Sequence, residues 1–266
     1  MVLIPVSQCA KSLDFGPSKP LPQALPPFAV RDGERAFLVS GFDRTDGDAV
    51  VLVGQIHELL SALYPSLTAP ETARLAQQLG ESLGFELRDA WLSLQGLRAS
   101  DELVSLLAKV ASSPRLFQDW VAAKGISLRE LTALTLASGP AVDGFCIDLA
   151  RSPASKAQGV AILELWCELA AMKTAPAAVQ LSNPEAALKE LQALRSPRTS
   201  ARDTEAAARL KTIAWPAHTQ ARWVRQGDQA GIEIKFHLYS ELDLERQLQG
   251  LTKVREHLSK DLWNRH

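Results

Sequence analysis

The chain has 266 residues, of which 46% are hydrophobic and 22% are charged, and its formal net charge is −1. This composition is too apolar for a disordered chain, and the near-zero charge argues against a uniformly basic nucleic-acid binder. The apolar runs are far shorter than the ~20 residues that span a bilayer, and the N-terminus lacks the basic start of a signal peptide. We therefore expect a cytoplasmic α+β protein, mainly α, that does not enter a membrane.

Residues 1–66 are expected to form a small α/β domain. A proline-rich lead-in over residues 16–27 is followed by β-like runs at Phe28–Arg31, Ala36–Ser40 and Ala49–Val53. Three acidic residues lie between the last two runs: Asp43, Asp46 and Asp48. Their spacing resembles the start of a calcium loop, but no glutamate occupies the twelfth loop position, so we interpret them as a polar turn and expect no metal site.

Residues 67–175 are expected to form a helical domain. Apolar spacing and capping signals predict helices over 71–79, 85–94, 101–110, 114–123, 128–136 and 155–172. The stretch Leu75–Leu94 has the form of a helix-turn-helix, whose second helix can enter a DNA major groove. That helix offers three candidate DNA contacts: Arg88, Ser93 and Gln95. Because it also carries Glu86 and Asp89, an ordinary pair of packed helices is the alternative.

The C-terminal third is expected to contain two further regions. Residues 176–202 predict a helix from Asn183 to Leu194 and then a basic linker, and residues 203–266 predict a β-hairpin followed by an amphipathic helix over 242–262. The apolar face of that helix suits a homodimer. Between Arg195 and Arg225 there are seven basic residues and two acidic ones. Four of the basic residues are candidate phosphate contacts: Arg198, Arg202, Arg209 and Lys211.

The motifs of three common enzyme classes are missing from the sequence. The patterns GxxxxGK[ST], GxGxxG and HExxH do not occur, so we expect no enzyme. Cys9, Cys146 and Cys167 form no CxxC pair and are expected to be reduced thiols. An enzyme using Cys9 is a minor alternative, because only Lys11 is near enough in sequence to lower the pKa of that thiol.

Four segments, taken in order, resemble the ParB-like partition and nucleoid-occlusion family. AFLVSGFDR (36–44) is similar to a segment of the family's ParB/sulfiredoxin-like domain, and Leu75–Leu94 stands where the family has its helix-turn-helix. KGISLRELTAL (124–134) and the long helix at 155–173 are similar to the segments that follow. The resemblance covers roughly residues 1–175 and is one of layout more than of identity.

The resemblance implies a protein that binds double-stranded DNA in chromosome or plasmid partition or in transcriptional regulation. It also implies CTP as a ligand of the loop in which Gly41 and Arg44 match the family pattern. Phe42 and Asp43 depart from that pattern, and Asp43 would repel a triphosphate, so residues 1–66 resemble a degenerate version of the domain. The alternative function is a non-enzymatic module that binds a protein partner and has lost DNA and nucleotide binding.

Overall fold

The computed structural model describes residues 2–16, 25–44, 46–226 and 229–258. The chain forms two compact units, residues 1–191 and 192–266. The expected fold class, mixed α+β and mainly helical, is confirmed.

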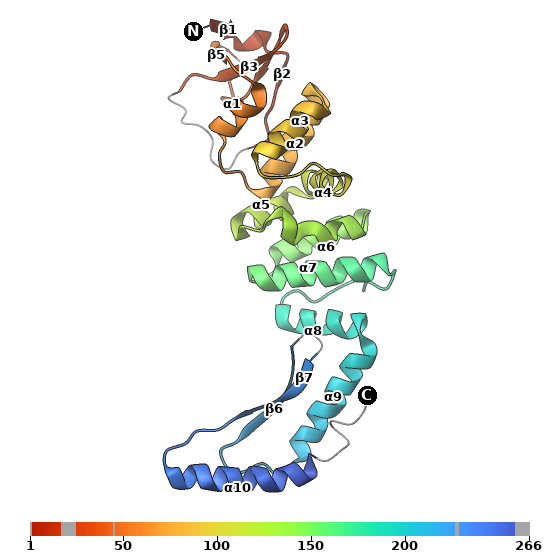
Figure 1. The fold of residues 1–266 in the computed structure, drawn as a ribbon. Helices are drawn as coiled ribbons and strands as arrows, with labels where there is room; N and C mark the ends of the chain where they lie inside the picture. Colours follow the sequence, from red (N-terminus) through yellow and green to blue (C-terminus); the bar gives the residue numbers. More distant parts are fainter. Residues whose placement is uncertain (1, 17–24, 45, 227–228, 259–266) are drawn as a thin grey trace. The chain divides into compact units, whose positions relative to one another are not determined.

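A five-stranded mixed sheet lies at the N-terminus of the first unit (Figure 1). Its order is β1-β5-β3-β4-β2, and the bounds are Val2–Pro5 (β1), Lys11–Ser12 (β2), Phe28–Asp32 (β3), Arg35–Leu38 (β4) and Asp48–Leu52 (β5). The three expected strands are confirmed as β3, β4 and β5. Strands β1 and β2 were not predicted; they are the two edge strands of the sheet and have only four and two residues.

Successive side chains along each strand point to opposite faces of the sheet, and both faces are apolar. One face forms a small cluster that includes Ile4, Ala29 and Val51. The other face, with Val30 and Phe37, joins a larger core shared with α1 (Ile56–Leu63) and the helices that follow. The regions 1–66 and 67–175 therefore share one continuous core.

Helix α2 (Ala69–Leu83) begins at a capping box, in which Thr68 and Glu71 bind each other's backbone. The expected end at Gly80 is wrong, because α2 continues one turn further, to Gly84 at φ +98°. Gly80 lies inside α2, where a Cβ would lie 3.4 Å from the Phe85 ring, an ordinary contact distance. Helix α3 (Phe85–Leu94) begins directly after Gly84 and packs against α2.

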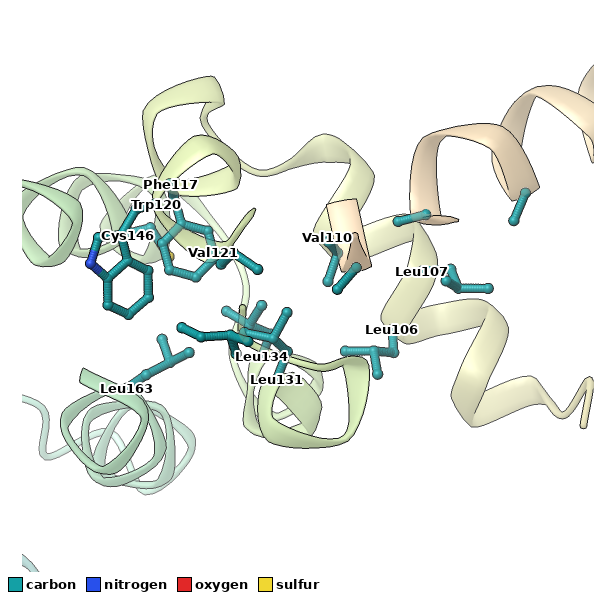
Figure 2. Close-up of a cluster of buried hydrophobic side chains, with 14 of the residues drawn as sticks. Leu106, Leu107, Val110, Phe117, Trp120, Val121, Leu131, Leu134, Cys146 and Leu163 are labelled. Carbon is teal, nitrogen blue, oxygen red and sulfur yellow. The ribbon is translucent and has the colours of Figure 1, made fainter. Parts of the chain in front are cut away.

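The rest of the first unit is a stack of helices around a common core (Figure 2). The elements are α4 (Asp101–Ser112), α5 (Arg115–Lys124), η2 (Leu128–Leu136), α6 (Pro140–Arg151), α7 (Lys156–Ala171) and the start of α8 (Pro184–Arg195). Two expectations are corrected: residues 128–136 form a 3₁₀ helix, and α6 was not foreseen. Gly159 of α7 faces Trp120, whose ring would lie 2.5 Å from an added Cβ.

The second unit contains α9 (Pro197–Thr212), a two-stranded sheet and α10 (Glu241–His257). The strands are β6 (Gln220–Gln226) and β7 (Gln229–Lys235), which confirm the expected hairpin. The expected linker over 196–202 is wrong, because Ser196 and Pro197 start α9, with proline in the first turn where its missing N–H costs nothing. The expected terminal helix is confirmed up to residue 257; its last residues, 259–262, lie outside the described ranges.

Candidate nucleic-acid interface

The corner between α2 and α3 is the place where the sequence predicts DNA contacts. Trp91 and Leu92 bury one side of α3, while Phe85 is 67% exposed and Leu94 52% exposed. Helix α3 is thus half-buried and presents a surface that is partly apolar. Glu86 is exposed on the same helix and adds negative charge.

All three predicted contact residues of α3 make interactions within the protein itself. The Arg88 side chain is only 13% exposed, pairs with Asp89 at 2.7 Å and lies over the Phe85 ring, 4.9 Å from its centroid. Ser93 Oγ donates to the Asp89 carbonyl at 2.9 Å, and Gln95 Nε2 donates to Ser61 Oγ at 3.1 Å. Each of the three side chains therefore makes an interaction within the protein, and that of Arg88 is also largely buried.

The next corner, between α3 and α4, is also negative. Asp101 and Glu102 are exposed in the first turn of α4, where Ser100 accepts a hydrogen bond from Leu103 N at 3.2 Å. A backbone N–H and Ser100 lower the pKa of Glu102 below its ordinary value, which keeps its carboxylate charged. These carboxylates stabilise the helix N-terminus and repel a phosphate backbone.

The loop after β4 holds the predicted nucleotide contacts, Gly41 and Arg44. Gly41 has φ +66°, and a Cβ there would lie 2.9 Å from Pro27, so the fold itself requires glycine at this position. Arg44 N donates to the Gly41 carbonyl at 3.0 Å. Asp43 is exposed beside Arg44, which offsets the positive charge of the loop.

Helix α9 carries an exposed row of arginines. Arg198, Arg202 and Arg209 are four and seven residues apart, so they lie on one side of the helix; we call them the arginine stripe. Arg209 pairs with Glu205 of the same helix at 2.6 Å, whereas Arg198 and Arg202 form no ion pair within the described residues. Lys211 is exposed but lies about 160° around the helix axis from the stripe.

The stripe conflicts with what helix stability alone would favour. The first turn of α9 contains Arg198 and no acidic residue, although a cation near a helix N-terminus is unfavourable by about 0.3–1 kcal/mol. The positive end of the helix dipole and the arginine instead add up to an anion-attracting surface. Local rules can be broken where a surface has a function, and this conflict makes the N-terminal half of α9 a candidate site.

Asp203, one of the two acidic residues of α9, points to the hairpin. It accepts hydrogen bonds from Trp223 Nε1 at 2.8 Å and from the Arg225 guanidinium at 2.7 and 2.8 Å. Arg225 is the main cause that lowers the pKa of Asp203 below its ordinary value. Arg222 similarly bonds Glu233 across the hairpin. Asp203 thus anchors the hairpin and does not neutralise the stripe, in which only Arg209 has a carboxylate partner, Glu205, among the described residues.

Periodicity in the sequence could have located the stripe. The spacing of four and seven residues and the Ser196-Pro197 start are helix signals, and only the low apolar content of 196–202 favoured a linker. The structure brings Arg198, Arg202 and Arg209 together and separates Lys211 from them. Arg88, Ser93 and Gln95 belong to the other compact unit.

The cysteines show no activation. Burial raises the pKa of the Cys9 thiol, and it raises the pKa of Cys146 and Cys167 to about 12. The reactive thiolate is therefore suppressed at all three. In the described part of the chain, no group of three or more His, Cys, Asp or Glu residues could hold a metal ion.

Comparison with known proteins finds no match among family models, curated proteins or solved structures. Among the described helices, none is both long enough and apolar enough to cross a membrane.

Proposed function

We propose that this protein binds double-stranded DNA through the phosphate backbone, with the arginine stripe of α9 as the contact surface. The observation that carries the proposal is the exposure of three arginines on one side of a helix, two of them with no ion pair in the described residues. An arginine matches phosphate oxygens in geometry and charge. Contacts of this kind position a protein on DNA and carry no sequence information themselves.

This proposal moves the DNA contact away from the helix-turn-helix. The acidic and apolar surface of α3, and the internal bonds of Arg88, disfavour base readout there. The protein would then bind DNA with low sequence specificity. It would act as a dimer of two identical chains and not as an enzyme. Partition or transcriptional regulation, which the ParB-like resemblance implies, is the setting we propose for it.

A mobility-shift assay with the full chain and a random duplex at low salt tests the proposal. We expect a shift that disappears in the variant Arg198→Glu/Arg202→Glu, because two attractive charges become repulsive. Alanine at Arg88 and Gln95 should change nothing, since neither side chain reaches the DNA. Absence of any shift with the unmodified chain would overturn the proposal.

A second candidate is a module that binds a protein partner. The exposed Phe85 on α3, beside Glu86, favours it, because an exposed aromatic side chain on a half-buried helix is typical of protein interfaces. Under this function, DNA would not shift at all, and Phe85→Ala would weaken capture of the partner without lowering the stability of the chain.

A further inference from the structure

The second unit has very little core of its own. Among its described residues, three apolar side chains are buried: Ala206, Leu210 and Val254. Several large apolar side chains are instead exposed: Leu238, Tyr239, Leu242, Leu244 and Leu248. A unit of this size gains little stability from so small a core, and small units of this kind often gain the rest by association.

One side of α10 is already occupied within the chain. Gln247 donates to the Ala217 carbonyl at 2.7 Å and accepts from Thr219 Oγ1 at 3.0 Å. Gly250 lies against Pro216, which a Cβ would approach to 2.5 Å, and Val254 is 3% exposed. These contacts fix which side of α10 remains open to solvent.

An apolar stripe runs along the neighbouring, open side of α10. Leu244, Leu248 and Leu251 are spaced by four and three residues, as in the seam of a coiled coil. Leu244 is 38% exposed and Leu248 is 55% exposed, while Leu251 is half-buried at the edge. The same stripe begins at Glu241 and ends at Arg255, both exposed and seven residues from Leu248. We call these five residues the α10 stripe.

The charges at the two ends of the α10 stripe select its partner. In an antiparallel pair of identical helices centred near Leu248, Glu241 of each copy approaches Arg255 of the other. In a parallel pair, Glu241 would meet Glu241, and Arg255 would meet Arg255, so like charges would repel. The stripe is therefore self-complementary in the antiparallel orientation only.

We propose that α10 pairs antiparallel with α10 of a second copy through this stripe, about a two-fold axis near Leu248. The proposal gives a surface and an orientation to the dimer that is part of the proposed function, and it does not require DNA binding. Isologous pairing of this kind is the commonest way in which identical chains associate. Two copies would carry two arginine stripes.

Light scattering of the full chain during size exclusion tests the pairing. We expect a mass of twice 28.9 kDa for the unmodified chain and 28.9 kDa for Leu248→Glu, which places two carboxylates at the axis. Leu242→Glu is the matched control: Leu242 is 53% exposed but lies about 120° around the helix, so that variant stays dimeric. A monomeric unmodified chain, or equal effects of the two variants, would overturn the proposal.

Charge exchange tests the orientation without perturbing any apolar residue. Glu241→Arg and Arg255→Glu should each raise the dissociation constant of the dimer several-fold, and the double variant should restore it. The two residues are ~21 Å apart within one helix, so the rescue can act only between copies. In a parallel pair, each single variant would merely exchange one like-charge pair for another, and no rescue would be seen.

The two proposals fail separately. A monomer that still binds duplex DNA overturns the pairing and leaves the arginine stripe intact. A dimer that binds no DNA overturns the proposed function and leaves the pairing intact.

Discussion

Alanine at Arg198 and Arg202 should flatten the salt dependence of DNA binding. Each phosphate that a protein neutralises contributes about 0.9 to the slope of log K against log salt, so three arginines give a slope of about −2.7 per copy. The double variant retains Arg209 alone, and its slope should fall to about −0.9. Between about 50 and 200 mM salt, this corresponds to losses of about 40-fold for the unmodified chain and about 3.5-fold for the variant.

Fluorescence anisotropy with a labelled duplex of about 30 base pairs measures both slopes over this range of salt. Lys211→Ala is the matched control, because it removes one positive charge from the opposite side of α9 and should leave the slope unchanged. If two copies bind one duplex, both slopes double and their ratio of three is preserved. An unchanged slope in the double variant, or an equal loss in Lys211→Ala, would refute the assignment to the arginine stripe.

Three further predictions concern stability and nucleotide. Gly159→Ala should lower the free energy of unfolding by about 1–3 kcal/mol in urea denaturation, because its Cβ meets the Trp120 ring; Gly144→Ala, with nothing within 4 Å, is the control and should not destabilise. Glu130→Ala should destabilise the chain at neutral pH, because hydrogen bonds from Ser127 hold the pKa of Glu130 at about 2. The stabilisation is fully present above about pH 4.3 and is lost as the pH falls through about 2. A difference in unfolding free energy between the two chains that persists below about pH 2 would contradict this prediction. CTP with magnesium should leave the DNA-binding curve unchanged, since Asp43 repels a triphosphate beside Arg44, and a CTP-dependent affinity would contradict this.

Elements with a strong local signal could be predicted from the sequence. The Asn183-Pro184 start of α8 is one: Asn183 Oδ1 accepts from Ala186 N at 3.1 Å, as a capping residue does. The edge strands β1 and β2 could not be predicted, because they are very short and owe their extended form to pairing with β5 and β4. Likewise, nothing local distinguishes the 3₁₀ turns of η2 from an α-helix with the same capping box.

The candidate site was harder to predict than the fold. Arg88 is an arginine in the second helix of the predicted helix-turn-helix, and this position predicted a DNA contact. Its side chain lies between Phe85 and Asp89, which only the three-dimensional structure shows. The basic residues of 195–225 stood out by charge, yet their division into an exposed stripe and the paired Arg222 and Arg225 depends on the hairpin. Charge can be counted in a sequence, whereas the partners that neutralise it must be seen in space.

Hydrogen–deuterium exchange of the full chain, with and without a saturating duplex, tests the central claim most directly. The arginine stripe predicts that the amides of 197–212 become protected on DNA binding while those of 85–94 stay as they are. Protection of 85–94 with no change in 197–212 would contradict the claim and return the DNA contact to the helix-turn-helix.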